Sequence, residues 1–363
     1  MKPLIIPIFI VYKGCPNRCL YCNERITAGN HPDKITERQF RETVDGYLKS
    51  ASKKWDRIEI AFYGGNFTGM DLDYQIELLS LANSYIKDGP VQSIRISTRP
   101  DYIDETRIGL LKKYGVTTVE IGAQSMVDDV LKRSRRGHSS DDVRSSVKIL
   151  KKSGFETGVH LMAGLPGDTP TRFMYTVEEI VRLKPDTARI HPTLVLKDTL
   201  LEDAYVKGNY RPLSLNEAVS LCAHALSQLR GADISVIRLG LHTTEEMGTD
   251  GSIVAGPFHP AFGALVEGSL FLDMASHLIR LSKRSDKGIT FSVSPKDVSR
   301  LRGLKNDNLV KLKDLFHVAK IRIIEDPLQE KESLVLIADG GTYKTDIKSC
   351  HANKEAMFRN NLN

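Results

Sequence analysis

Short β-branched segments alternate with longer amphipathic segments through the first two-thirds of this chain. The β-branched runs predict six strands, and a seventh run at Ile234–Leu239 is a further candidate. Apolar residues spaced three and four apart predict a helix in each intervening segment. The predicted strands are Leu4–Val11, Arg57–Phe62, Ser93–Ser97, Thr117–Gly122, Thr157–Leu161 and Thr187–His191. The predicted helices are Glu37–Lys49, Tyr74–Ile86, Glu105–Tyr114, Ser140–Ser153, Arg172–Leu183 and Leu215–Leu229.

This alternation restricts the fold to a small set. Consecutive strand–helix units form parallel strands joined by right-handed crossovers, which build either an open sheet or a barrel. In a barrel, functional groups gather where strands end and loops begin. The motifs described next lie at such positions, which favours the barrel, so we predict an α/β barrel over residues 1–241.

Three of the five cysteines lie close together, directly after the first predicted strand. Cys15, Cys19 and Cys22 have the spacing C-x3-C-x2-C. An odd number of cysteines in a long chain without a signal-peptide pattern argues against a disulfide framework. Three such thiolates can each bind one iron of a [4Fe–4S] cluster and leave the fourth iron without a protein ligand. Zinc with His31 as fourth ligand is the alternative, although structural zinc sites usually add a second cysteine pair, which this sequence lacks.

A second motif, Tyr63-Gly64-Gly65-Asn66, follows the second predicted strand. Glycines at such a turn let the backbone approach a ligand closely, and the Asn66 amide oxygen can accept a hydrogen bond. Further polar residues are expected at strand ends facing the barrel mouth, where they either contact a ligand or form a polar network under the loops. These residues are Thr98, Arg99, Glu120 and Gln124.

The cysteine triplet resembles that of the radical S-adenosylmethionine (SAM) enzymes. The resemblance implies a partial (β/α)6 TIM-like radical SAM barrel in which the three cysteines hold the cluster and SAM chelates the open iron. It also implies cleavage of SAM to a 5′-deoxyadenosyl radical that abstracts hydrogen from a substrate, with an electron donor such as ferredoxin or flavodoxin. The family has Gly-Gly-Glu where this chain has Gly64-Gly65-Asn66, so an amide replaces the carboxylate that holds the cofactor's ammonium group. The cofactor contacts predicted in this way are Tyr21, Tyr63, Gly64, Gly65, Asn66, Thr98, Arg99, Glu120 and Gln124, with no catalytic residue assigned.

Five further segments resemble the radical domain of the Elongator catalytic subunit. They are residues 97–102, 119–125, 130–138, 161–168 and 190–195, and the resemblance covers about residues 1–240. Elongator-type proteins continue into an acetyltransferase domain, but residues 270–363 offer neither its length nor its phosphate-binding loop, so acetyl transfer is not expected here. The resemblance implies transfer RNA, or another RNA, as the partner.

The C-terminal segment has a charge pattern of its own. Lys283–Arg322 holds 11 basic and 4 acidic residues, whereas the whole chain carries a net charge of only +6. The segment predicts a small α+β module over 283–340, in which two helices, Pro295–Arg302 and Asn308–Phe316, flank a turn. The turn resembles the GxxG loop of a KH domain, which clamps single-stranded nucleotides. Gly303 supplies the first glycine and Asn306 stands at the second, so Arg300, Arg302 and Lys305 would contact phosphates, unless they form a solvated basic face.

Two regions remain between and beyond these modules. The Gly-rich stretch His242–Gly268 predicts a long loop, either an active-site lid or a linker, with a helix at Leu270–Leu281, so that 242–282 connects the two modules. The tail, 341–363, is expected to be weakly ordered beyond Thr342. No apolar run approaches the length of a membrane span, and we expect a cytoplasmic protein without a membrane partner.

Two other functions fit the same motifs. Elongator-type barrels also resemble anaerobic coproporphyrinogen oxidases, which leaves the oxidation of a small molecule open. The replacement of the family's Glu by Asn66 also leaves a non-catalytic iron–sulfur protein that binds RNA.

Overall fold

A computed structural model describes residues 3–11, 13–29, 34–51, 55–241, 251–282, 288–338 and 341–349. The chain forms two compact units. The first contains Met1–Leu213 and Leu241–Phe258, and the second contains Ser214–Gly240 and His259–Asn363. Each unit is described by itself below.

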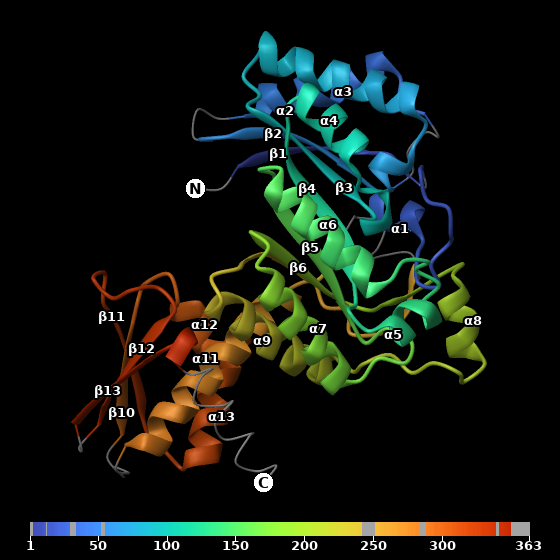
Figure 1. The fold of residues 1–363 in the computed structure, drawn as a ribbon. Helices are drawn as coiled ribbons and strands as arrows, with labels where there is room; N and C mark the ends of the chain where they lie inside the picture. The colour runs from blue at the N-terminus through green and yellow to red at the C-terminus, as the bar shows by residue number, and fades with distance from the viewer. Residues whose placement is uncertain are drawn as a thin grey trace. The chain divides into compact units, whose positions relative to one another are not determined.

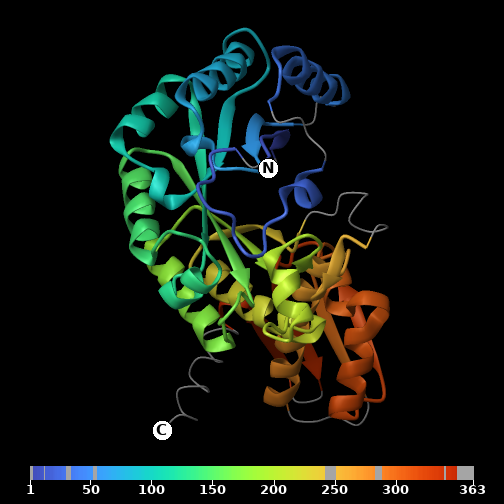
Figure 2. The same ribbon diagram turned by 90° about the vertical axis from the view of Figure 1, so that its right-hand side faces the viewer.

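The first unit is built on six parallel strands that lie side by side in chain order. Figures 1 and 2 show that the sheet curls and that helices cover its convex side. The predicted α/β fold with a partial barrel is therefore confirmed. The strands are β1 (Leu4–Phe9), β2 (Ile58–Tyr63), β3 (Ser93–Thr98), β4 (Val116–Gln124), β5 (Glu156–Ala163) and β6 (Thr187–Pro192). The covering helices are α2 (Glu37–Ser50), α3 (Leu72–Lys87), α4 (Glu105–Lys113), α6 (Ser140–Lys152) and α7 (Pro170–Leu183).

Strand residues alternate between the two faces of this sheet. One set is apolar and fully buried, for example Ile60, Ile94 and Val119, as expected for the face that packs against amphipathic helices. The other set is polar and meets across the inside of the curl, because Arg189 on β6 donates a hydrogen bond to Tyr63 on β2. The interior of the barrel is therefore lined by polar side chains.

Several short elements of the first unit were not predicted from the sequence. The antiparallel pair β7 (Val195–Leu196) and β9 (Ile253–Ala255) packs Leu196 beside Ile253. Three short helices also occur, along with single 3₁₀ turns at Phe67–Gly69 and Pro100–Tyr102. The short helices are α1 (Glu24–Ala28), α5 (Asp128–Arg133) and α8 (Leu200–Val206).

The second unit contains a four-stranded sheet in the order β11-β10-β12-β13, and the helix α11 (Phe262–Leu281) packs against β12 and β13. The strands β10 and β11 are parallel, and the other two pairs are antiparallel. Its strands are β8 (Ser235–Leu239), β10 (Ile289–Val293), β11 (Ile321–Glu325), β12 (Ser333–Ala338) and β13 (Gly341–Asp346). Its helices are α9 (Leu215–Gly231), α11 (Phe262–Leu281), α12 (Val298–Arg302) and α13 (Asp307–Phe316), with a 3₁₀ turn at Leu304–Asn306.

Two expectations for this part of the chain were wrong. The predicted loop 242–268 contains β9, and α11 begins at Phe262, eight residues before the predicted helix start at Leu270. The predicted tail begins too early, because 341–346 forms β13, which is held by pairing with β12. Residues 242–250 and 350–363 lie outside the described residues, so the lid remains a prediction. Apart from this order at the start of the tail, the domain limits 1–241, 242–282, 283–340 and 341–363 remain a prediction.

The helix α11 is the one described helix that is long and apolar enough to cross a membrane by length and composition. Over half of its apolar stretch is buried, and it contacts α9, α12, α13 and β12. A core helix of a folded domain has the same composition, so this feature is accounted for by packing inside the second unit.

Candidate functional site

The three clustered cysteines lie in the loop between β1 and α1. Cys15 is exposed, Cys22 is half-buried and Cys19 is buried. Burial, followed by the charges of Glu24 and Cys19, raises the pKa of the Cys15 thiol to about 11. Burial, followed by Glu24 and the other two thiols, raises the pKa of Cys22 as well. The three thiols are therefore close enough to influence one another's ionisation.

This donor set fits an iron–sulfur cube better than a single ion. Within the described residues, no three His, Cys, Asp or Glu side chains converge on one point that could hold a metal ion. A cube takes each thiolate on a different iron, so its ligands need only surround it. His31, the fourth ligand of the zinc alternative, lies outside the described residues.

The Gly64–Gly69 loop packs backbone to backbone against the cysteine loop. A Cβ atom at Gly65 would lie 2.6 Å from the Ile10 carbonyl oxygen and 2.7 Å from that of Lys13. Gly14 has a φ of +74°, and a Cβ there would lie 2.1 Å from the Asn66 carbonyl oxygen. Gly65 and Gly14 therefore have a direct steric reason to be glycine, because any side chain would push the two loops apart.

Asn66 joins the two loops to the end of β3. Its side chain is fully buried, and its amide nitrogen donates to the Gly14 carbonyl at 2.7 Å. Its amide oxygen accepts hydrogen bonds from the Thr98 hydroxyl at 2.6 Å and the Arg99 backbone N–H at 3.0 Å. An ionised carboxylate could not donate to Gly14. This geometry gives a structural reason for asparagine at this position, and a cofactor contact by Asn66 or Thr98 remains a prediction.

Arg99 is held by a carboxylate and a carbonyl beside the cysteine loop. Its guanidinium binds both oxygens of Asp101, at 2.9 and 2.8 Å, and donates to the Arg136 carbonyl at 2.5 Å. With these contacts, Arg99 orders the segment around Arg136, and its predicted contact with the cofactor remains untested.

Glu120 was expected at a strand end, and this expectation was wrong. It lies in the middle of β4, inside the barrel, where its carboxylate accepts hydrogen bonds from Arg95 at 2.7 Å, Arg189 at 2.8 Å and His160 at 2.6 Å. Arg95 also pairs with the fully buried Glu59 at 2.8 Å. We call Glu59, Arg95, Glu120, His160 and Arg189 the barrel floor, and within it the charges of two arginines and two glutamates balance.

The barrel floor shifts the pKa of its members. Burial raises the pKa of Glu120, but Arg189, His160 and Arg95 together hold it well below its usual range. Burial lowers the pKa of His160, against the opposing effect of Glu120. The barrel floor is therefore a paired structural layer beneath the strand ends, and it needs no ligand to neutralise it.

The remaining predicted contacts lie around this layer. Tyr63 ends β2, its hydroxyl accepts from Arg189 at 2.8 Å, and burial raises its pKa to about 12. Burial also raises the pKa of Tyr21, which lies beside Cys19 and Arg136. Gln124 ends β4 with a φ of +66°, a conformation that L residues adopt only under constraint.

Arg136 is the site residue that the sequence reasoning missed. It follows α5, is buried, and brings its guanidinium within 3.3 Å of the Cys19 sulfur. It lay in a segment that matched the Elongator resemblance, but no local pattern indicates that this segment meets a loop 117 residues away. His160 and Arg189 carried a signal of a different kind, since each is a titratable residue in the interior of a predicted strand.

The predicted phosphate contacts of the second unit lie around the α12–α13 turn. Arg300 is engaged by Glu267 at 2.8 Å and Asp297 at 2.6 Å, so its charge is neutralised within the fold. Arg302 and Lys305 are exposed. Gly303, Lys305 and Asn306 all have positive φ, and a Cβ at Gly303 would lie 2.7 Å from the Asn308 side chain. The turn therefore has a tight backbone with several left-handed residues, and its resemblance to a GxxG loop remains a prediction.

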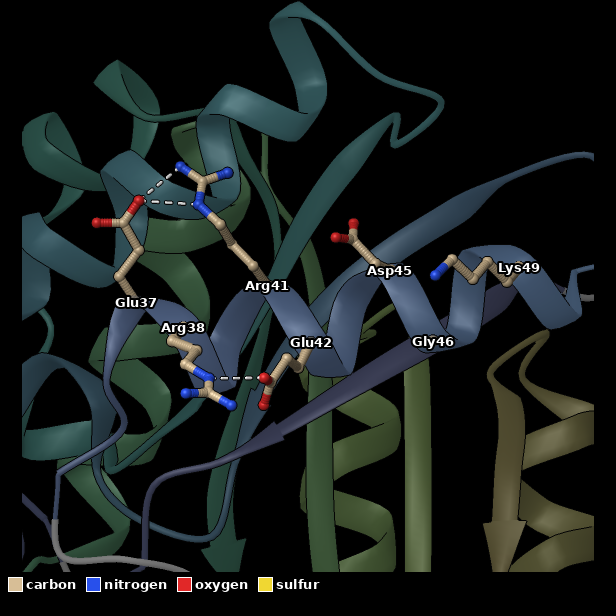
Figure 3. A pocket seen from close by; sticks show the side chains of 7 residues that line it. All are labelled: Glu37, Arg38, Arg41, Glu42, Asp45, Gly46 and Lys49. Carbon is tan, nitrogen blue, oxygen red and sulfur yellow. Dashed lines mark hydrogen bonds and ion pairs between the residues drawn. The ribbon is translucent and has the colours of Figure 1, made fainter.

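A separate hollow lies along α2 (Figure 3) and is formed by charged side chains of that helix. Glu37 pairs with Arg41 at 2.8 Å, and Arg38 pairs with Glu42 at 2.8 Å. Such pairs one helical turn apart are typical of a solvated helix face. None of the predicted site residues lines this hollow.

Comparison with known proteins agrees with this geometry. Residues 9–180 match the model of the Radical SAM superfamily, and residues 185–271 match the Radical_SAM C-terminal domain. This chain belongs to the radical SAM superfamily. The first of these matches begins at the end of β1 and includes the cysteine loop and the Gly64–Gly69 loop. It also includes the residues of the barrel floor on β2, β3, β4 and β5.

Among curated proteins, this radical SAM chain is similar to Elongator-type relatives, as predicted. It is 28% identical over 251 residues to a tRNA uridine(34) acetyltransferase of Methanocaldococcus infernus, which covers 59% of this chain and 47% of the relative. It is 28% identical over 257 residues to Elongator complex protein 3 of Saccharomyces cerevisiae, covering 60% and 45%. The chain thus spans about half the length of these relatives.

A solved structure of the archaeal Methanocaldococcus infernus Elp3 with an N-terminal deletion has the same fold. It superposes with a TM-score of 0.59 at 22% identity, covering 79% of this radical SAM chain and 65% of the other. At this identity the similarity extends to the fold alone.

Proposed function

We propose that this radical SAM protein is an enzyme in which Cys15, Cys19 and Cys22 hold a [4Fe–4S] cluster and the barrel mouth binds SAM. The observation that carries the proposal is the placement of three neighbouring thiols in one loop, against which the Gly64–Gly69 loop packs. When bound, these groups supply reductive cleavage of SAM to a 5′-deoxyadenosyl radical. The residues of the chain position the two loops, with Asn66 and Gly65 fixing their spacing and the barrel floor closing the interior beneath them.

The test is anaerobic reconstitution with iron and sulfide, followed by measurement of bound iron and of 5′-deoxyadenosine released from SAM under a strong reductant. We expect the wild-type protein to bind about four irons per chain and to release 5′-deoxyadenosine, and Cys19→Ala to lose both properties. Cys222→Ala is the matched control, because Cys222 is also buried but lies on α9 in the second unit. Iron binding without 5′-deoxyadenosine would indicate a non-catalytic iron–sulfur protein, and absence of iron would refute the proposal.

We further propose that the substrate is an RNA, with transfer RNA as the first candidate, and that the second unit binds its backbone. The Methanocaldococcus infernus relative is a tRNA uridine(34) acetyltransferase, which supports this choice. The exposed Arg302 and Lys305 beside a left-handed turn form a suitable phosphate contact. A cytoplasmic location and electron delivery by ferredoxin or flavodoxin stay predictions.

RNA binding is tested by titrating single-stranded RNA and tRNA at several salt concentrations. We expect the double variant Arg302→Gln/Lys305→Gln to reduce the slope of log affinity against log salt by about 1.4, since each lost phosphate contact on a single strand contributes about 0.7. The control is Lys148→Gln/Lys207→Gln, which removes the same charge from exposed lysines of the first unit. Equal slopes for the two double variants would exclude the turn as the RNA contact.

A further inference from the structure

Arg136 is a buried cation with an unusual set of partners. Its side chain lies in the interior of the first unit, with the residue only 7% exposed. One terminal nitrogen lies 3.3 Å from the Cys19 sulfur, and the other donates to the Gly122 carbonyl at 2.6 Å. The third nitrogen, Nε, is buried and has no hydrogen-bond partner among the described residues.

The charge of Arg136 lacks a carboxylate. Arg95 and Arg99 are also buried in this unit and Arg189 is half-buried, and each of the three pairs with an Asp or Glu. Over the described part of the chain, Arg136 forms no such ion pair. A buried charge is costly unless an opposite charge meets it. The group that contacts Arg136 and can carry a negative charge is the sulfur of Cys19. The Tyr21 hydroxyl also lies near the guanidinium, but burial raises its pKa, so the phenol stays neutral at ordinary pH.

Two loops hold Arg136 in this position. Its backbone N–H donates to Leu131 at 3.0 Å, and its carbonyl accepts from Arg99 at 2.5 Å. Gly137 has a φ of +73°, and a Cβ there would lie 2.1 Å from the side-chain nitrogen of Asn17 in the cysteine loop. These backbone contacts therefore hold the Arg136 guanidinium against the cysteine loop.

We propose that Arg136 is a positioning residue for the iron–sulfur cluster, which it retains and whose reduction potential it raises. The inference rests on the proposed function. Three thiolates outweigh the positive charge of an oxidised cube, so the ligated cluster is anionic and becomes more so on reduction. A fixed cation that donates N–H to a cysteine sulfur stabilises the reduced form more than the oxidised form, and hydrogen bonds to sulfur set such potentials.

The experiment is a redox titration of the reconstituted protein, monitored by electron paramagnetic resonance without SAM or substrate. Arg136→Gln removes the charge, and Arg136→Lys keeps it but loses the second donor. We expect Arg136→Gln to shift the cluster's reduction equilibrium at least tenfold toward the oxidised form, about 59 mV for one electron, with Arg136→Lys between it and the wild type. Arg133→Gln is the control, because Arg133 lies three residues away, is exposed and pairs with Asp129.

The outcomes separate the two proposals. If wild-type protein binds the cluster and Arg136→Gln binds it with an unchanged potential, the role of Arg136 is refuted while the proposed function stands. If the wild type binds no iron, the proposed function fails first. If Arg136→Gln holds no cluster, Arg136→Lys decides: a potential below the wild type's supports the inference, and an unchanged potential overturns it.

Discussion

The barrel floor and the cysteine loop both bury arginines, but they neutralise them differently. In the barrel floor, Arg95 and Arg189 face Glu59 and Glu120 at ion-pair distances of 2.7–2.8 Å. Beside the cysteine loop, Arg136 faces a carbonyl and a thiol, with no carboxylate among the described residues. The floor is therefore electrostatically complete in the protein alone, whereas the charge of Arg136 lacks a carboxylate and would be met by the proposed cluster. Four predictions test this contrast.

Arg95→Met is expected to have the largest effect on stability. It leaves the fully buried Glu59 with only the partly exposed Arg57, at 2.6 Å, and leaves Glu120 with Arg189 and His160. Breaking a buried pair typically costs about 3–5 kcal/mol, and the remaining partners place the expected loss at the lower end of that range. Denaturant unfolding of the protein without iron measures this loss. Arg41→Met on the exposed face of α2 is the control, with an expected loss of about 0.5 kcal/mol or less. A loss below about 1 kcal/mol for Arg95→Met would mean that the floor is not a structural layer.

Asn66→Asp comes next. It replaces the donor to the Gly14 carbonyl by an oxygen that repels it, and a buried unsatisfied group costs about 1–3 kcal/mol, more when a charge is added. Asn83→Asp is the matched control, because Asn83 donates to the Tyr114 carbonyl at 2.9 Å but is only half-buried. Equal losses in the two variants, measured by denaturant unfolding, would contradict the bracing role of Asn66.

His138 is expected to make the first unit sensitive to acid. Burial, followed by the charges of Arg136 and Arg99, lowers its pKa to about 3. Below the unfolded-state pKa of about 6.5, His138 binds a proton in the unfolded chain but stays neutral in the folded chain. The free energy of unfolding therefore decreases as the pH falls. The loss should reach about 2 kcal/mol between pH 6.5 and 5, at about 1.4 kcal/mol per unit.

The measurement for His138 is unfolding free energy as a function of pH. His138→Gln should flatten the dependence between pH 6.5 and 5. The exposed His317 supplies the control variant His317→Asn, which should leave the wild-type slope in place. A wild-type slope that persists in His138→Gln would assign the acid sensitivity to another group.

Arg136→Met is expected to have the smallest effect on the protein without iron. It loses one hydrogen bond to Gly122, about 1 kcal/mol, but also removes a buried charge that no carboxylate compensates. The unfolding free energy should therefore stay within about 1 kcal/mol of the wild type, in contrast to Arg95→Met. A loss as large as that of Arg95→Met would show that Arg136 is as much a structural arginine as those of the floor.

Local pattern was enough to place most of the elements. The six strands of the barrel were predicted to within a few residues, because parallel strands buried by helices show runs of β-branched residues. The start of α11 was missed because Gly263 and Gly268 lowered its helical signal. The helix includes Gly268 because this residue is buried where α11 contacts α12, and a Cβ there would lie at an ordinary contact distance, 3.6 Å, from the Arg300 carbonyl oxygen. That packing reason is not visible in the local sequence.

The candidate site divides in the same way. The cysteine spacing and the glycine pair could be recognised in the sequence because thiolate ligands and tight turns require particular residues at short, regular intervals. The roles of Glu120, Asn66 and Arg136 could not be predicted from the sequence, since each depends on a partner that the folding of the sheet brings close. A charge is stabilised or left uncompensated by what surrounds it in space, and only the tertiary structure decides which arginine meets a carboxylate and which meets a sulfur.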